Sequence, residues 1–239
     1  MLINLSIFLR PLIYLFFKGN KFTDPIDGKF YRKFLPYGYG KQRENALSPG
    51  TLSLERHRQM WLYLQNETDF FTKNYKVLHI APEQEFLRKF KKMKNLEYTS
   101  ADLFSPIVDV KADILDLPFE DESFDVIFCN HVLEHIIDDK KAMSELYRVM
   151  KKGGWGILQV PMKNSLGKTY EDFTITEPKE RQKHFGQYDH VRWYGMDYFE
   201  RLKSVRFSVD INFYSQKFSK KEQKRFGLNV TEILPIVRK

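Results

Sequence analysis

The sequence has almost no cysteine, with Cys129 as the single example in 239 residues. One cysteine cannot form an intrachain disulfide, and it excludes a zinc site built on several thiolates. The histidines and acidic residues show no spacing that we can assign to a metal centre, so we expect no metal. A lone cysteine is typical of a reducing compartment, and we expect a cytoplasmic protein.

The sequence also lacks an apolar run long enough to span a bilayer, which needs about 20 residues. The N-terminal segment MLINLSIFLRPLIYLFFKGNK has apolar residues at helical spacing, but no basic start or small-residue cleavage site of a signal peptide. Two interpretations stay open. Residues 1–18 form an apolar helix in peripheral contact with a membrane, or this helix packs on the rest of the protein.

Basic residues are in excess, with a net charge of +8 and a pI near 9.3. This excess favours an anionic neighbour such as a membrane surface, nucleic acid or an acidic substrate, although a basic protein without such a partner fits equally. The basic residues are scattered and no appended RNA-binding module is visible, so nucleic acid is the less expected partner. Nothing in the sequence indicates an oligomeric state.

The pattern of elements predicts two parts. Residues 1–70 comprise the apolar helix, an irregular turn-rich segment at 20–50 and a helix at 52–71. From residue 71 to 239, short apolar strands alternate with amphipathic helices, which is typical of a parallel sheet covered by helices. Long, polar and aromatic chain at 162–192 resembles a lid or an insertion.

Individual elements of the second part are bounded by clear signals. The strand candidates are YKVLHIA, LEYTSADL, VDVKADI, FDVIFCNHVL and WGILQVP. A helix capped by Asp138 is expected to run to Gly153 and Gly154, where glycines would stop it. The segments VRFSVDINFY and TEILPIVRK look like closing strands, and if they form a hairpin, a basic loop joins them.

Polar residues follow several of these strands at the points where ligands bind in open α/β sheets. Asp102 follows the second strand, and a carboxylate there can accept hydrogen bonds from both hydroxyls of a ribose. Asp113 with its apolar neighbour Ile114 suits the amino group and ring of an adenine. Asn130 and His131 follow the fourth strand. Each residue alone has a structural explanation, such as a cap, but together they converge on one edge of one predicted sheet.

The stretch ADILDLPFEDESFDVIFCNHVLEHIIDDKKAMSELYRVMKKGGWGILQVP resembles the central half of class I S-adenosylmethionine-dependent methyltransferases. The resemblance is detailed over residues 75–161, looser over 190–239, and absent from 1–70. It implies a Rossmann-like, mostly parallel seven-stranded sheet with helices on both faces. The implied strand order is 3-2-1-4-5-7-6, with strand seven antiparallel.

The same resemblance implies S-adenosyl-L-methionine as the cofactor and assigns residues to it by position. The first turn would lie by the methionine part, Asp102 and Leu103 by the ribose, and the third strand end by the adenine. Asn130 would lie under the methionyl or sulfonium region, with His131 nearby. The implied cofactor-binding residues are Ala81, Pro82, Glu83, Asp102, Leu103, Asp113, Ile114, Asn130 and His131.

The first turn departs from the family pattern, in which an acid precedes Gly-x-Gly-x-Gly. Here the acid position is His79 and the glycine positions hold Ala81, Glu83 and Glu85. Because S-adenosylmethionine has an ammonium group and no phosphate, a carboxylate from Glu83 could serve where glycines usually allow close approach. This holds provided that no residue of the turn needs a positive φ. The alternative is that the turn is a degenerate loop that binds nothing.

Methyl transfer from a sulfonium is an in-line displacement, so the protein mainly positions the reactants. If the acceptor must lose a proton, His190 and His131 are the predicted catalytic bases, with His190 in an acceptor-contact segment beside Asp189 and Arg192. His135 and His184 are further candidates. The expected acceptor is a small molecule or a glycan- or lipid-linked intermediate. The alternatives are an RNA methyltransferase and a non-catalytic binding or scaffold protein.

Overall fold

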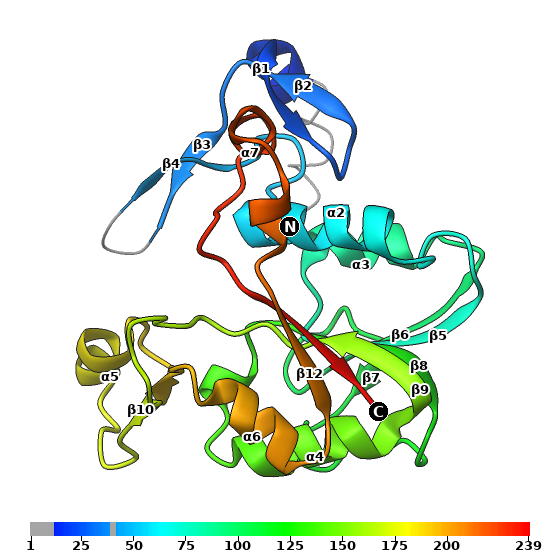
Figure 1. The fold of residues 1–239 in the computed structure, drawn as a ribbon, viewed down its shortest axis with the longest axis vertical. Helices are drawn as coiled ribbons and strands as arrows, with labels where there is room; N and C mark the ends of the chain where they lie inside the picture. Colours follow the sequence, from blue (N-terminus) through cyan, green and yellow to red (C-terminus); the bar gives the residue numbers. More distant parts are fainter. Residues whose placement is uncertain (1–11, 39–41) are drawn as a thin grey trace. The chain divides into compact units, whose positions relative to one another are not determined.

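The computed structural model describes residues 12–38 and 42–239 (Figure 1). The chain forms two compact units. The larger unit consists of Thr72–Asn212 and Leu234–Lys239. The chain between them, Phe213–Ile233, belongs to the smaller unit together with the N-terminal part. The predicted division near residue 70 does not include this return of the chain to the smaller unit at Phe213–Ile233.

The larger unit is built on a seven-stranded sheet in the order β12-β13-β9-β8-β5-β6-β7. Strand β13 is antiparallel to both of its neighbours, and the other pairs are parallel. Read from the other edge, this is the predicted order 3-2-1-4-5-7-6, which is confirmed. The strands are β5 (Tyr75–Ile80), β6 (Leu96–Asp102), β7 (Val110–Lys111), β8 (Phe124–Cys129), β9 (Met150–Ile157), β12 (Ser208–Asn212) and β13 (Leu234–Arg238).

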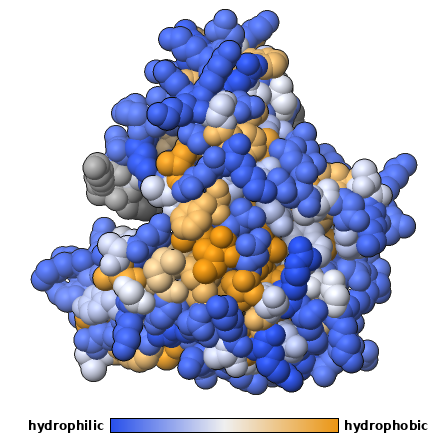
Figure 2. All heavy atoms as spheres, in the orientation of Figure 1, coloured by the Kyte–Doolittle hydropathy of each residue, from blue (hydrophilic) through white to orange (hydrophobic). Residues whose placement is uncertain are grey.

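Hydrophobic runs place β5 and β8 at the centre of this sheet. Residues 77–80 and 126–129 are buried, because helices cover both faces of a parallel sheet. Figure 1 shows α3 on one side of the sheet and α4 and α6 on the other. These helices are α3 (Gln84–Phe90), α4 (Asp139–Val149) and α6 (Tyr198–Ser204). Most side chains on the face shown in Figure 2 are hydrophilic.

Helix α4 begins as predicted but ends earlier than predicted. The Asp138 side chain accepts a hydrogen bond from the Lys141 backbone N–H at 3.0 Å and caps the helix. The expected continuation to Gly153 is wrong, since the helix ends at Val149 and β9 begins at Met150. Pairing of Met150 with β8 accounts for the early end, because the sheet takes the backbone groups that a further helical turn would need.

The closing strands pair as the sequence suggested, and β12 and β13 form an antiparallel ladder. The joining segment, however, is not a simple loop. It contains a 3-10 helix, η2 (Tyr214–Lys217), and a helix, α7 (Lys220–Phe226). Ser219 and Glu222 form a reciprocal capping box at the start of α7, and Gly227 ends it at φ 57°.

The expectation of irregular chain at 20–50, within the smaller unit, is wrong. Two short antiparallel hairpins form there, and Phe22 and Tyr31 pack with Phe34 in a buried cluster. The elements are β1 (Lys18–Asp24), β2 (Lys29–Tyr31), β3 (Leu35–Tyr37), β4 (Arg43–Leu47) and α2 (Glu55–Glu67). The helix predicted at 52–71 is α2, and Ser53, which precedes it, donates a hydrogen bond to Asp24.

The predicted N-terminal helix falls partly outside the described residues. Residues 12–17 are helical, and Leu12, Leu15 and Phe16 are exposed there. Among the residues that the structure describes, no helix is both long and apolar enough to cross a membrane. The predicted membrane contact of residues 1–18 stays a prediction.

Candidate active site

A cavity of about 460 Å³ opens at the carboxyl ends of the parallel strands, where ligands of such sheets bind. Its volume suits a small-molecule ligand. A second hollow of about 600 Å³ lies at the opposite strand ends and is lined by charged surface side chains, so it is the weaker candidate. The first cavity is lined by Ile80, Ala81, Asp102, Leu103, Phe104, Ala112, Asp113, Ile114, His131, Val132, His135, Ile136 and Asp189.

Six of the nine predicted cofactor residues line this cavity. Asp102 ends β6, and its Oδ1 accepts hydrogen bonds from the backbone N–H groups of Phe104 and Ser105, at 2.7 and 2.6 Å. Its Oδ2 makes no hydrogen bond to any described residue and is available to a ligand. Asp113 is exposed, and the neighbouring Ile114 is buried at the cavity wall. Adjacent strand ends thus supply a polar group, from Asp102, and an apolar one, from Ile114.

The first turn breaks the condition placed on it. Ala81 has φ 45°, in the left-handed region that favours glycine, so the condition that no residue of the turn needs a positive φ is not met. The Ala81 backbone N–H donates to the Ala101 carbonyl at 2.8 Å, which holds the turn against β6. The turn therefore keeps the backbone path that glycine usually takes, at the cost of local strain.

Glu83 does not line the cavity but folds back onto the sheet. Its Oε2 lies 2.8 Å from His79 Nε2, and its Oε1 accepts from Asn130 Nδ2 at 3.3 Å. His79 Nδ1 in turn lies 2.9 Å from the Tyr98 hydroxyl. The carboxylate that the family places in the strand at position 79 is thus supplied by Glu83, four residues later. Its partners fix its position at the end of β5.

Asn130 and Pro82 are also absent from the cavity wall. Asn130 is buried, and its Oδ1 accepts a hydrogen bond from the Gln159 backbone N–H at 3.2 Å. It therefore links β8, β9 and the first turn through Glu83. His131 lines the cavity and has φ 55°, which turns the chain sharply after β8. Of the two predicted bases, His131 is the one that reaches the cavity.

His190 is placed behind the cavity wall, where it is 6% exposed. Its Nε2 lies 4.0 Å from Glu134 Oε1, and its Nδ1 lies 3.2 Å from the Phe185 carbonyl. Burial lowers the pKa of His190 below its ordinary value, against an opposing effect of Glu134. Its predicted role as a general base stays a prediction, and its surroundings favour another role.

Arg192, expected in an acceptor-contact segment, is fully buried and structural. It donates to the carbonyls of Leu133, at 2.9 Å, and Ile137, at 2.8 Å, and it forms an ion pair with Glu171 at 2.8 Å. Arg192 belongs to β11 (Arg192–Trp193), which pairs with β10 (Tyr170–Glu171) in the segment expected to be a lid. It therefore holds the chain that carries Glu134 and His135.

Sequence reasoning missed Glu134. It is fully buried in the 3-10 helix η1 (Leu133–His135), and the imidazole nitrogens of His135 and His190 lie near its oxygens. Burial acts to raise the pKa of Glu134, but His131 and His135 outweigh it and hold this pKa below its ordinary value. The adjacent letters EH in LEHI were the only signal, since His190 is remote in sequence.

Comparison with known proteins agrees with this geometry. Residues 62–158, less than half of the chain, match the family model described as a methyltransferase domain. The matched range includes β5, β6, β7 and β8, whose carboxyl ends form the cavity. Over this range the chain is therefore similar to a methyltransferase domain. The chain is also 32% identical over 106 residues to an uncharacterized protein of Methanocaldococcus jannaschii, covering 44% of this chain and 41% of that protein.

Other relatives match the chain over shorter stretches. A demethylmenaquinone methyltransferase of Clavibacter sepedonicus is 44% identical over 45 residues, which is 19% of this chain and 18% of that protein. The chain therefore spans less than half of the length of these curated relatives.

Solved structures show the shared fold. The [4+2]-cyclase SpnF has a TM-score of 0.52 at 15% identity, covering 90% of this chain and 89% of its own. An S-adenosylmethionine-dependent methyltransferase from Mesorhizobium loti has a TM-score of 0.52 at 10% identity, covering 75% and 96%. At these identities the likeness shows the fold alone, and one of the two proteins is a cyclase.

Proposed function

We propose that this chain is an S-adenosylmethionine-dependent methyltransferase that acts on a small-molecule or glycan- or lipid-linked acceptor. The cavity at the strand ends carries the proposal, because Asp102 presents an unpaired carboxylate oxygen there, next to the apolar wall formed by Ile114 and Val132. A nucleoside needs this combination, with a hydrogen-bond acceptor for the ribose hydroxyls and an apolar surface for the base.

Two further residues near this cavity bear on the cofactor. Glu83 holds a carboxylate at the end of β5, on the side where the methionyl ammonium is expected, although it does not line the cavity and is held by His79 and Asn130. Phe104 is 86% exposed at the cavity wall, and its ring is available for contact with a bound ligand. When bound, the cofactor supplies an activated methyl group on its sulfonium.

The part of this chain in catalysis would be to position the acceptor and to exclude water. Among the predicted bases, His131 has access to the cavity and could take a proton from an acceptor hydroxyl or amine. The demethylmenaquinone methyltransferase among the relatives supports a small-molecule acceptor. The aromatic side chains Phe104, Phe173 and Tyr188 are exposed in this unit and suit an apolar or aromatic acceptor.

The test is calorimetric titration of the full chain with S-adenosylmethionine and with S-adenosylhomocysteine. We expect saturable binding that Asp102→Ala weakens on the order of tenfold or more, because the ribose hydroxyls lose a charged acceptor. Asp210→Ala is the matched control, since Asp210 is exposed on β12 away from the cavity, and it should bind normally.

No binding by the wild-type protein at millimolar cofactor would reject the enzyme. Binding without methyl transfer to a panel of small phenols, amines and quinols would instead favour the non-catalytic alternative. Because the cyclase SpnF has the same fold, this second outcome is worth testing separately.

A further inference from the structure

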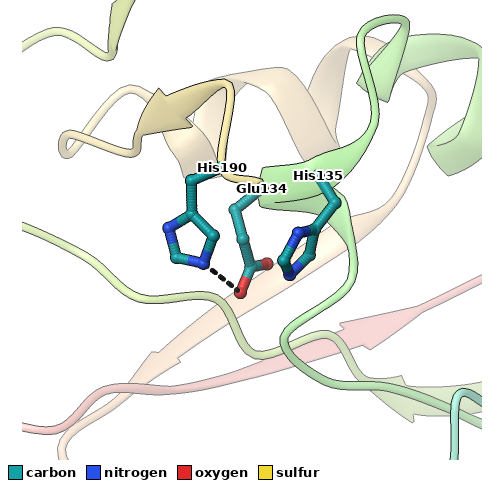
Figure 3. A group of neighbouring side chains, drawn as sticks. All are labelled: Glu134, His135 and His190. Atoms are coloured by element: carbon teal, nitrogen blue, oxygen red, sulfur yellow. Dashed lines mark ion pairs between the residues drawn. The ribbon is translucent and has the colours of Figure 1, made fainter. Parts of the chain in front are cut away.

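A buried carboxylate and two imidazoles meet beside the cavity wall. Glu134 is fully buried, and neither of its carboxylate oxygens accepts a well-formed hydrogen bond within the described chain, His131 Nδ1 lying 3.3 Å from Oε1 as an ion-pair contact. One donor atom from each of Glu134, His135 and His190 lies within 4.8 Å of the others. Figure 3 shows the carboxylate between the two rings. An unpaired carboxylate in the protein interior is costly, so this arrangement calls for a cation.

The hydrogen bond of His190 decides which of its nitrogens can bind that cation. Its Nδ1 lies 3.2 Å from the Phe185 carbonyl, and since a carbonyl oxygen only accepts, Nδ1 carries the proton. In the neutral ring, Nε2 then has a lone pair, and it lies 4.0 Å from Glu134 Oε1. Two electron-rich atoms thus face each other at 4.0 Å. This is the orientation that a backbone carbonyl gives to metal-binding histidines.

His135 has a comparable outer partner. Its Nδ1 lies 3.4 Å from Asp189 Oδ2, and a carboxylate behind an imidazole orients the ring and makes it a better ligand. The His135 ring packs edge-on against that of His190, with centroids 4.7 Å apart. Because His135 also lines the cavity, this cluster is continuous with the proposed cofactor site.

Backbone contacts fix the cluster from behind. The Val191 backbone N–H donates to the Glu134 carbonyl at 2.9 Å, next to His190 in the chain. Arg192 holds the Leu133 carbonyl from the same side at 2.9 Å. The two sequence segments that supply the three side chains are therefore tied together without the aid of a ligand, which is what a preorganised site requires.

We propose that Glu134, His135 and His190 bind a divalent first-row transition metal ion such as Zn²⁺. Two imidazoles and one carboxylate form a ligand set that suits zinc and its neighbours, whereas Mg²⁺ and Ca²⁺ prefer oxygen ligands alone. Three protein ligands leave a coordination position open, as in catalytic zinc sites. An acceptor oxygen in the cavity could take that position, a consequence that rests on the proposed function, whereas metal binding itself does not.

The competing explanation is that a proton, rather than a metal ion, neutralises the Glu134 carboxylate. His131 Nδ1 lies 3.3 Å from Glu134 Oε1, and a protonated His131 would neutralise the carboxylate without any metal. The two explanations predict different responses to added metal, because a site already neutralised by a proton binds Zn²⁺ weakly and its Zn²⁺ affinity does not depend on His135.

The experiment is titration of Zn²⁺ into the full chain after treatment with a chelator and dialysis, by calorimetry, together with elemental analysis of the chain as purified. We expect one Zn²⁺ per chain and a rise in melting temperature on saturation. Glu134→Gln and His135→Ala should each weaken Zn²⁺ binding on the order of tenfold or more. His184→Ala is the matched control, as an accessible histidine outside the cluster, and should bind Zn²⁺ normally.

Unchanged Zn²⁺ affinity in both cluster variants, or no saturable binding by the wild-type chain, would overturn the proposal. Circular dichroism checks that the variants fold, and His135→Ala is the safer variant because the His135 side chain is 28% exposed. Titration with S-adenosylhomocysteine on the same samples, without metal, separates this result from the proposed function. Loss of cofactor binding with retained Zn²⁺ binding would reject the enzyme and leave the metal site.

Discussion

The two units each contain a fully buried arginine, and the two arginines are stabilised in different ways. Arg58 in the smaller unit has no carboxylate within ion-pair distance among the described residues. Burial lowers its pKa to about 10. Arg192 in the larger unit pairs with Glu171 at 2.8 Å and donates to carbonyls of the chain around η1. Backbone carbonyls satisfy the N–H groups in both cases, but only one unit supplies a full counter-charge.

The difference shows what each arginine does. Arg58 joins pieces of the smaller unit that are far apart in the sequence, through the carbonyls of Ala46, Ser53, Phe226 and Gly227, at 2.6 to 2.9 Å. Arg192 joins β11 to the chain that carries Glu134 and His135. The first arginine stabilises a fold, and the second positions a site within a fold that the hydrophobic sheet already stabilises.

The largest effect is expected from Arg58→Met. Removing the guanidinium leaves several buried carbonyls unpaired, and at about 1–3 kcal/mol for each unsatisfied group we expect about 4 kcal/mol or more of destabilisation in the smaller unit. Hydrogen exchange should show lost amide protection in α2 and α7, with little change in β5 and β8. Equal loss in both units would contradict the assignment of Arg58 to one unit.

Arg192→Met should have the next largest effect, about 3 kcal/mol, because the carbonyls around η1 lose their partner and Glu171 keeps only Arg201. We also expect weaker Zn²⁺ binding, measured by calorimetry. Arg201→Met is the matched control, since Arg201 pairs with Glu171 and Asp139 but has no hydrogen bond to these carbonyls. If Arg201→Met weakened Zn²⁺ binding as strongly, the positioning role of Arg192 would be wrong.

A smaller effect is expected from pH. Burial acts to raise the pKa of Glu171, but Arg201 and Arg192 outweigh it and lower this pKa. A depressed folded-state pKa stabilises the protein above the unfolded value near 4.3 and loses this effect as the pH falls below it. Glu171→Gln should therefore narrow the difference between urea midpoints at pH 7 and at acidic pH. If the difference between the two urea midpoints is unchanged, the ionised Glu171 carboxylate does not contribute to stability.

The smallest effect is expected at two strained turns, one in each unit. Ala81 has φ 45° and Leu52 has φ 66°. Glycine removes about 1–2 kcal/mol of left-handed strain but costs about 0.5–1 kcal/mol of chain entropy, so Ala81→Gly and Leu52→Gly should each stabilise by about 0.5 kcal/mol. Urea unfolding measures this. Ala101→Gly, in regular β6, is the control and should destabilise.

The larger unit could be predicted from the sequence because local sequence patterns determine its helices and strands. The apolar runs of β5 and β8, the Asp138 cap and the acids at strand ends each depend on a few neighbouring residues. Convergence of the strand ends then follows from the topology of a parallel sheet. These local patterns and this topology are enough to predict that Asp102 lies at the cavity wall.

The smaller unit and the histidine cluster could not be predicted in the same way. Strands β1 to β4 are short and polar, and they depend on packing around Tyr31 and Phe34 rather than on a clear alternation. The cluster needs Glu134 and His190 to meet through β11, which is a tertiary contact. The sequence predicts Glu83 as a carboxylate of the first turn. It does not predict that His79, which stands where the family has an acid, is the partner of that carboxylate.

The path of the chain between β12 and β13 has a consequence for folding. Both units are discontinuous in the sequence, because the smaller one needs Phe213–Ile233 and the larger one needs β13, which follows that segment. During synthesis, neither unit can be completed before these segments leave the ribosome. The edge of β9 that pairs with β13 therefore keeps unpaired backbone N–H and C=O groups until β13 is made, after the last segment of the smaller unit.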